Sequence, residues 1–160
     1  MRIGQSTDIH AFTEGRPLIL GGVEIEHSMG LLGHSDADVL LHAISESIIG
    51  ALGLGDIGKH FPDTDPSYQG ISSLILLEKT AELMDQQGYQ LVNLDSLILI
   101  EKPRIAPYIQ EMKANIAKAL HCNDSQINVK ATRGEKLGFI GRQEGVMAQA
   151  VVLLERKSVK

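Results

Sequence analysis

The sequence predicts an α+β fold, in which helices pack on one face of a mixed β-sheet within a single domain over residues 1–160. Three observations support this prediction. The order of predicted strands and helices is typical of helices that cover one face of a sheet. The chain has no internal repeat or linker, and its length suits one core. The last predicted strand is apolar on both faces for much of its length, so we expect self-association in a closed symmetric oligomer to cover the sheet.

Short strands are predicted at the start of the chain. Residues 1–12 are predicted to form the first strand. Residues 18–20 and 23–25 form two further short apolar runs on either side of Gly21-Gly22. Two glycines between short β-rich runs are typical of a hairpin turn. We therefore expect these two strands to pair with each other.

One long helix is predicted from about Ser35 to Leu52. Ser35 is its predicted N-cap, and Asp38 three residues later completes a capping box. Apolar residues with helical spacing follow and define the buried face. Gly53 is then expected to end the helix.

A polar segment with two prolines and three aspartates spans residues 56–66. This composition predicts an irregular loop. Long loops in compact domains are usually functional, and carboxylates in this loop suit the hydroxyl groups of a polyol. The alternative is a plain surface connector.

The rest of the chain continues the alternation of helices and strands. Ser72 or Ser73 is expected to begin a second helix, which Gly88 closes. The remaining predicted elements are a strand over 89–101, a helix over about 107–121, a strand over 127–132, a glycine-rich loop over 133–145 and a last strand over 146–155.

Composition excludes several classes of function. The net charge of −5 argues against a nucleic-acid-binding surface, which needs positive potential. No apolar run is long enough for a membrane span, and the N-terminus lacks a signal-peptide pattern, so we expect a cytoplasmic protein with no membrane partner. With Cys122 as the single cysteine, no internal disulfide is expected.

A local basic cluster contrasts with the acidic balance of the whole chain. Lys130, Arg133, Lys136 and Arg142 occur close together with a single acidic neighbour, Glu135. Such a cluster in an acidic protein suggests a small anionic ligand. The alternative is a solvated surface cluster without a ligand.

Two segments far apart in the sequence offer metal ligands. Asp8 and His10 lie two residues apart in the first predicted strand, so their side chains point to one face. His42 on the long helix supplies a second imidazole. Zn²⁺ accepts nitrogen and oxygen ligands, and a catalytic zinc keeps its fourth position open. The alternative is that His42 is a buried, hydrogen-bonded residue on a polar helix face.

Other polar residues surround His42 in the sequence. Asp38 at i−4 and Glu46 at i+4 are predicted to orient its imidazole. His34 lies just before the predicted helix start, where unpaired backbone N–H groups favour anions. These residues extend the predicted site beyond the three metal ligands.

Four motifs occur in one order along nearly the whole chain. They are Asp8-x-His10-x-Phe12, the run from Leu31 to Asp38, the run from Gly55 to Asp65 and the run from Glu135 to Phe139. In residues and spacing the set resembles the 2-C-methyl-D-erythritol 2,4-cyclodiphosphate synthase family.

This resemblance implies an enzyme of the non-mevalonate isoprenoid pathway, a phosphorus–oxygen lyase. Its substrate would be 4-diphosphocytidyl-2-C-methyl-D-erythritol 2-phosphate. The 2-phosphate attacks the β-phosphorus of the same molecule, which gives 2-C-methyl-D-erythritol 2,4-cyclodiphosphate and CMP. The resemblance also implies a homotrimer with active sites at the subunit interfaces. Joining two phosphates needs charge neutralisation and positioning more than a protein nucleophile, and the sequence offers metal ligands and a basic cluster.

The resemblance assigns metal and phosphate roles to particular residues. Asp8, His10 and His42 would bind one Zn²⁺ per subunit, and Asp8 and His10 also contact the substrate. Glu135 would help to hold a second divalent cation, Mg²⁺ or Mn²⁺, with the diphosphate. His34 and Ser35 would bind phosphate at the helix N-terminus.

The remaining assigned residues would hold the organic parts of the substrate. The methylerythritol would contact Asp56, Ile57, Gly58, Phe61, Pro62, Asp63, Thr64 and Asp65. The cytidine and its phosphates would contact Ile100, Glu101, Lys102, Pro103, Arg104, Ile105, Ala106, Ala131, Thr132, Arg133 and Gly134. Phe139 and Arg142 resemble residues near the trimer axis, where Arg142 would bind an anionic ligand.

The chain departs from the family pattern at two places. Ser6 and Thr7 stand where the family usually has a glycine and an aromatic residue. Arg133-Gly134 replaces the usual threonine and small hydroxyl residue. Our hypothesis is that Arg133 binds and positions the diphosphate through charge-assisted contacts. The alternatives are that Arg133 weakens the enzyme or points into solvent.

Two rival functions would use the same residues. A metal-dependent phosphohydrolase would use the Asp/His set to activate a water molecule. A metal- or nucleotide-binding module would bind its ligand without catalysis. The products formed, and the presence of turnover, distinguish these rivals from cyclisation.

Overall fold

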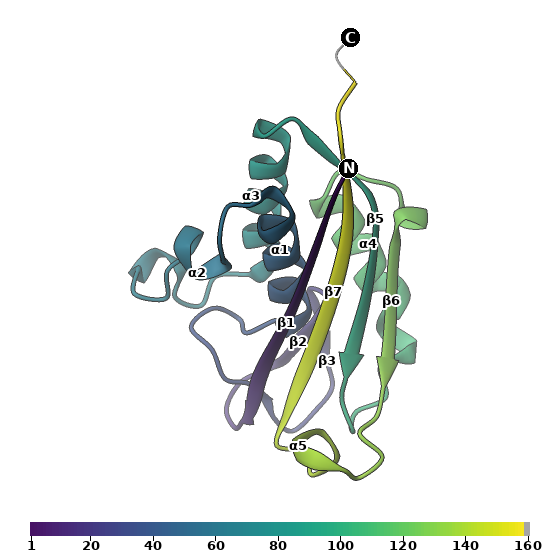
Figure 1. The fold of residues 1–160 in the computed structure, drawn as a ribbon. Helices are drawn as coiled ribbons and strands as arrows, with labels where there is room; N and C mark the ends of the chain where they lie inside the picture. Colours follow the sequence, from purple (N-terminus) through teal and green to yellow (C-terminus); the bar gives the residue numbers. More distant parts are fainter. Residues whose placement is uncertain (159–160) are drawn as a thin grey trace.

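A computed structural model describes residues 1–158 and confirms an α+β fold with a mixed β-sheet (Figure 1). The sheet has five strands in the order β4-β1-β7-β5-β6. Only β5 and β6 pair in parallel within this sheet of the described residues. In sheet order the strands are β4 (Gly30–Leu31), β1 (Arg2–Thr13), β7 (Gly145–Arg156), β5 (Tyr89–Leu99) and β6 (Ile127–Thr132).

The three long helices are α1 (Val39–Leu52), α3 (Ser73–Gln86) and α4 (Ile109–Ala119). In Figure 1, α4 lies behind β5 and β6, and α1 and α3 stand beside each other next to β1. Because alternate residues of β7 are fully buried and those between them are not, the prediction that helices cover one face of the sheet is confirmed. α1 packs across β1 and β7, and α4 packs against β6. Within residues 1–158, no helix is long and apolar enough to cross a bilayer.

The two faces of the sheet differ in burial. Every second residue of β7, from Val146 to Leu154, is fully buried beneath the helices. The opposite face carries exposed apolar side chains, among them Ile3, Ile9 and Val151. Ile3 lies opposite Leu153 in the β1–β7 register, so the apolar surface continues across strands.

The predicted hairpin is confirmed. β2 (Leu18–Leu20) and β3 (Val23–Ile25) pair antiparallel, with Leu20 opposite Val23. Gly21 and Gly22 both adopt positive φ, at 60° and 70°, which a two-residue hairpin turn of this kind requires.

The predicted start of the long helix is wrong. α1 begins at Val39, and its N-cap is Asp38, whose carboxylate accepts a hydrogen bond from the Leu41 N–H at 3.1 Å. Ala37 has a φ of 60°, in the left-handed region, so a right-handed helix cannot run through it from Ser35. His34 and Ser35 therefore lie in the turn before the helix and not at its N-terminus.

Two predicted loops contain short helices. α2 (Ile57–His60) and the 3₁₀ helix η1 (Pro66–Tyr68) interrupt the segment 56–66. Asp56 and Asp65 cap them by accepting the N–H groups of Lys59 and Ser67, which explains how so polar a segment forms helical turns. Likewise, α5 (Gly138–Gly141) lies within the predicted loop 133–145.

Smaller differences concern element ends. The pairing of β4 with the end of β1 was not predicted, because two residues carry no periodic pattern. The third predicted helix is divided into η2 (Ala106–Tyr108) and α4. A further 3₁₀ helix, η3 (Asp124–Gln126), precedes β6, and the strand predicted over 89–101 ends at Leu99.

Candidate metal centre and adjoining cavities

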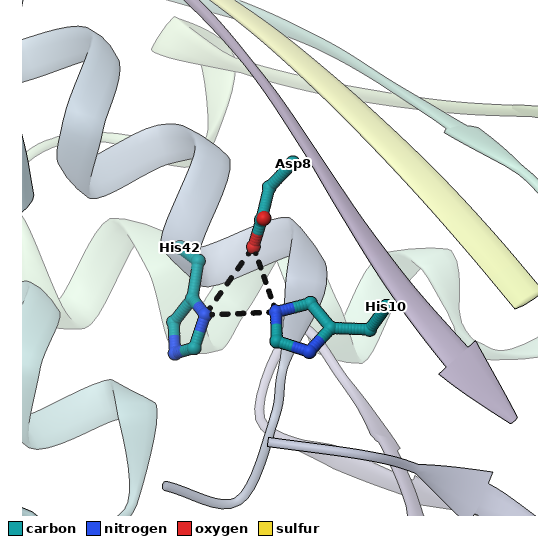
Figure 2. Close-up of side chains that lie close together, drawn as sticks. All are labelled: Asp8, His10 and His42. Atoms are coloured by element: carbon teal, nitrogen blue, oxygen red, sulfur yellow. Dashed lines mark hydrogen bonds and ion pairs between the residues drawn. The ribbon is translucent and has the colours of Figure 1, made fainter. Parts of the chain in front are cut away.

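The predicted metal ligands meet where α1 crosses β1. Strand alternation directs Asp8 and His10 toward the helix, and His42 projects toward them from α1 (Figure 2). Gly4 permits the close approach, because a Cβ at this position would lie 1.8 Å from the carbonyl oxygen of Ser47. β1 and α1 therefore pack closely enough for residues four to six positions further along β1 to reach the helix.

The three donor atoms form a compact triangle. Asp8 Oδ2 lies 2.9 Å from His10 Nε2 and 3.3 Å from His42 Nδ1, and the two ring nitrogens are 3.3 Å apart. Ligand atoms of a tetrahedral ion with bonds near 2.05 Å are separated by about 3.3 Å. The triangle thus fits three vertices of a tetrahedron. The residues can hold a metal ion and leave a fourth position for another ligand.

Hydrogen bonds to the far sides of the rings hold both imidazoles. His10 Nδ1 donates to the carbonyl oxygen of Leu32 at 2.6 Å, which leaves Nε2 facing the triangle. His42 Nε2 lies 3.0 Å from the hydroxyl oxygens of both Ser35 and Ser73. Such contacts fix ring orientation at metal sites.

The prediction that Asp38 and Glu46 orient His42 is wrong. The Asp38 carboxylate accepts hydrogen bonds from the backbone N–H groups of Gly21 and Gly22, at 3.0 and 2.7 Å, and of Leu41. This ties the hairpin to the start of α1. Burial raises the pKa of Asp38 to about 6, although these backbone donors favour the ionised form.

Glu46 links β1 to α2. One of its carboxylate oxygens accepts a hydrogen bond from the Ser6 hydroxyl at 2.5 Å, and the other lies 3.4 Å from the Ile57 backbone N–H. Neither bond involves His42. Helical spacing alone could not show that Ser6 and Ile57, and not His42, are the hydrogen-bond partners of Glu46.

The triangle favours an ion pair between Asp8 and His10. Burial is the largest single influence on both groups and opposes their charge, but their hydrogen bonds and the attraction between opposite charges together outweigh it. The pKa of Asp8 is therefore held well below its usual range, and the pKa of His10 is raised. A metal ion at this position must displace the proton from His10 Nε2, so metal binding there is coupled to pH.

A cavity of about 270 Å³ adjoins the triangle. It brings together residues that the sequence analysis assigned to metal, phosphate and methylerythritol, namely His10, His34, Ser35, His42, Ile57, Phe61 and Asp63. Tyr68 and Leu76 also line it and were not predicted. Leu76 belongs to the regular apolar pattern of α3, which indicates a core residue and gives no sign of a cavity. For Tyr68 the only signal in the sequence was its aromatic side chain close to the polar loop.

Other predicted residues of this loop have structural contacts around the cavity. Asp56 caps α2, which contains Gly58. The carbonyl oxygen of Asp65 accepts a hydrogen bond from His34 Nε2 at 3.2 Å. Pro62 and Thr64 lie on the segment between Phe61 and Asp65, in the turn between α2 and η1. The loop is thus attached to the turn before α1.

A second cavity, of about 180 Å³, lies at the ends of β5 and β6. It gathers most residues predicted to hold cytidine, namely Ile100, Pro103, Arg104, Ile105, Ala106, Ala131, Thr132 and Arg133. Lys102 lies on the same segment, and Glu101 accepts a hydrogen bond from the Gly134 N–H at 3.0 Å. This contact joins the loop after β5 to the loop after β6.

The last three predicted residues lie between β6 and β7. Glu135 is exposed, with a φ of 51°. Phe139 is half-buried on α5. Arg142 is exposed and forms an ion pair with Glu144 at 2.7 Å. The guanidinium of Arg142 is thus already balanced by a carboxylate of the same chain.

The two cavities lie on different strands of one chain. The first adjoins β1 and the second adjoins β5 and β6, with β7 between them. Adjacent strands are about 4.8 Å apart, so β1 and β6 are separated by about 14 Å across the sheet. The residues predicted to hold the nucleotide therefore lie on other strands than the one that carries Asp8 and His10.

Fold and site together define an α+β protein with a metal-binding triangle beside a ligand-sized cavity, and the chain belongs to the YgbB family, whose model matches residues 1–155. Its relatives are named 2-C-methyl-D-erythritol 2,4-cyclodiphosphate synthase. The chain is 60% identical to that of a Geobacillus species, over 98% of this chain and 99% of the relative. It is 58% identical to that of Syntrophobacter fumaroxidans, over 96% and 97% respectively.

Solved structures give the same result. The bifunctional IspDF of Campylobacter jejuni matches with a TM-score of 0.93 and 43% identity, over 97% of this chain and 42% of that protein. IspF of Plasmodium falciparum, in complex with CDP, matches with a TM-score of 0.86 and 37% identity, over 98% and 97%. The family predicted from the sequence motifs is confirmed.

Proposed function

We propose that the chain converts 4-diphosphocytidyl-2-C-methyl-D-erythritol 2-phosphate to 2-C-methyl-D-erythritol 2,4-cyclodiphosphate and CMP, as a phosphorus–oxygen lyase of the non-mevalonate isoprenoid pathway in the cytoplasm. The observation that carries this proposal is the triangle of Asp8, His10 and His42 beside a cavity, in a chain of this family. The similar Plasmodium falciparum structure that contains CDP supports a cytidine diphosphate substrate.

We further propose that Asp8, His10 and His42 hold Zn²⁺. Two imidazoles and one carboxylate are ligands that Zn²⁺ accepts, and the fourth position would be open to a phosphate oxygen. When bound, the ion would polarise the phosphate and neutralise part of its charge. His34 lies beside the ligands in the same cavity, where it would contact the phosphate and help to position it.

The diphosphate would lie between the two cavities. Arg133 lines the second cavity and would contact the diphosphate. Exposed Glu135, two residues further on, would help to hold a second divalent cation, Mg²⁺ or Mn²⁺. In-line attack within one substrate molecule needs its two phosphates to be held together, and these groups would supply that positioning.

The active enzyme would be a homotrimer. The face of the sheet without helices carries exposed Ile3, Ile9 and Val151, an apolar surface that a neighbouring subunit would cover. The two cavities of one chain adjoin different strands, and β1 and β6 are about 14 Å apart across the sheet. A neighbouring subunit would place its nucleotide cavity beside the metal triangle of the first, so that each active site is formed between subunits.

Product analysis tests the activity. The purified chain is incubated with the substrate and divalent metal, and the phosphorus products are followed by ³¹P NMR. We expect a cyclic diphosphate with an equal amount of CMP. Inorganic phosphate as the product would identify a phosphohydrolase. Binding of CDP without any turnover would identify a binding module.

Light scattering tests the assembly. A homotrimer has a solution mass of three times the 17.4 kDa chain. A monodisperse monomer with full turnover would contradict an active site formed between subunits.

A further inference from the structure

The second ring nitrogen of His42 is the starting point. Figure 2 shows this nitrogen, Nε2, turned away from Asp8 and His10. It lies 3.0 Å from the hydroxyl oxygen of Ser73 and 3.0 Å from that of Ser35. Ser73 is fully buried at the first position of α3, and Ser35 is 5% exposed. Both hydroxyls are thus shielded from water, so their hydrogen-bond partners must be protein groups.

Asp36 determines the direction of these hydrogen bonds. One carboxylate oxygen accepts from the Ser73 hydroxyl and from the Asp38 N–H at 3.1 Å. The other accepts from the Ser73 backbone N–H at 2.9 Å. A serine hydroxyl has one proton, and the Ser73 proton is given to the carboxylate. Toward His42, Ser73 can therefore only accept, so the proton between them belongs to His42 Nε2.

Ser35 is compatible with the same direction. Its oxygen accepts a hydrogen bond from the Ala37 N–H at 3.2 Å, and it lies 3.5 Å from the Ser73 oxygen. Its hydroxyl proton can point to Ser73, and its second lone pair can accept from His42 Nε2. Every proton in the cluster then has an acceptor, and the Nε2 proton of His42 is shared between the two serine oxygens. Ser35 is anchored by the backbone, whereas Ser73 is anchored by a carboxylate.

We infer that Asp36 and Ser73 are positioning residues that keep the proton of neutral His42 on Nε2 and so keep Nδ1 free as a metal ligand. The inference rests on the proposed metal centre and extends it to two residues outside the ligand set. We name the series of contacts from Asp36 through Ser73 to His42 the Asp36–Ser73–His42 relay. The relay supports the His42 ring on its outer side, as the Leu32 carbonyl oxygen supports the His10 ring.

The relay also joins the metal centre to the substrate loop. The Asp36 N–H donates to the carbonyl oxygen of Ile71 at 3.0 Å, and the Gly70 N–H donates to that of His34 at 2.9 Å. The end of the loop that lines the first cavity is thus held against the turn that carries Asp36. Ser73, two residues after Ile71, is the first residue of α3. The position of this loop end and the orientation of His42 are fixed by one set of hydrogen bonds.

Two single variants and a control test the relay. Ser73→Ala removes the acceptor of His42 Nε2 that is held by Asp36 and leaves only the Ser35 hydroxyl beside this nitrogen. In Asp36→Asn the amide cannot accept all three hydrogen bonds, so Ser73 is free to donate to His42 and shift the ring proton to Nδ1. Ser45→Ala is the matched control, because Ser45 is a buried serine on α1 whose hydroxyl has no hydrogen-bond partner within residues 1–158. Thermal unfolding of the metal-free proteins verifies that each variant folds.

The first readout is the affinity for Zn²⁺, measured by competition with a chromophoric chelator. Loss of a supporting partner at a metal site typically weakens binding by about 10–100-fold, which we expect for Ser73→Ala and Asp36→Asn. Ser45→Ala should stay within about twofold of the parent chain. In a double variant the two losses should not add, because both act through one hydrogen bond.

The second readout is the ¹⁵N spectrum of the His42 ring in metal-free protein at alkaline pH. The parent chain should carry its proton on Nε2, and Asp36→Asn should increase the share on Nδ1. A parent ring protonated mainly on Nδ1 would overturn the relay even if neither variant folds. So would additive losses in the double variant, or unchanged Zn²⁺ affinity in Ser73→Ala. A parent chain that binds no Zn²⁺ would overturn the proposed metal centre itself, which is a distinct result.

Discussion

The two cavities differ in how far one chain completes them. Around the metal triangle, each imidazole is held on its far side by a group of the same chain, Leu32 for His10 and Ser73 for His42. At the second cavity, Ala131, Thr132 and Arg133 are exposed at the end of an edge strand. The proposed metal-binding half of the site, the metal half, is preorganised within one chain, whereas the proposed nucleotide-binding half, the nucleotide half, is open. We therefore expect metal binding to survive changes that abolish turnover.

The largest expected effect is on the metal half. His42→Ala removes one of three ligands, so Zn²⁺ affinity should fall by more than the roughly 100-fold that loss of a supporting group can cause. Metal content after dialysis against Zn²⁺ buffer, measured by elemental analysis, checks this. Retention of one equivalent of tightly bound zinc would place the ion elsewhere.

Next in size is a change to the open sheet face. Ile3 is 73% exposed, so Ile3→Lys should leave the isolated subunit folded, whereas a lysine in a subunit interface buries an unpaired charge. We expect monomers by light scattering, loss of most turnover and Zn²⁺ affinity within about twofold of the parent chain. A trimer with normal activity would show that this face lies outside the interface.

The pH dependence of metal binding should be smaller and confined to the metal half. The pKa of His10 is raised above 6.5, the ordinary imidazole value. As pH falls, its proton therefore begins to compete with the metal before pH 6.5 is reached. As pH falls through this range, Zn²⁺ affinity should weaken by about tenfold per unit for one displaced proton. Asp8, with its lowered pKa, stays ionised there. Competition titrations at about five pH values between about pH 5.5 and 8.5 measure how Zn²⁺ affinity changes with pH.

The smallest expected effect concerns the nucleotide half. Arg133→Thr removes a cationic donor from the second cavity, so KM should rise by about tenfold, the value of one charge-assisted hydrogen bond. Zn²⁺ affinity should not change. Steady-state kinetics separate KM from kcat, and an unchanged KM or improved turnover would count against a role for Arg133 in binding diphosphate.

The sequence was sufficient where chemistry and periodicity agreed. Alternation along β1 placed Asp8 and His10 on one face, and the structure brings them to His42 as expected. The hairpin at Gly21-Gly22 was equally clear, because its turn requires positive φ at both residues.

The errors arose where tertiary partners outweigh local spacing. Asp38 has helical spacing to His42, but three backbone N–H groups occupy its carboxylate. The left-handed φ of Ala37 has no signal in an alanine side chain, so the start of α1 was misplaced. Ser73 was considered only as a helix start. Its contact with His42 depends on how α3 packs beside α1, which no local pattern encodes.

The alternation of β1 has a consequence for variation in this chain. Even-numbered residues Asp8 and His10 face α1, and odd-numbered Ile3 and Ile9 face the open side of the sheet. Inserting a single residue near the middle of β1 would exchange the two sets over the rest of the strand. Insertions or deletions in this strand should therefore be tolerated only when they change its length by two residues. A substitution on one face leaves the residues of the other face in place.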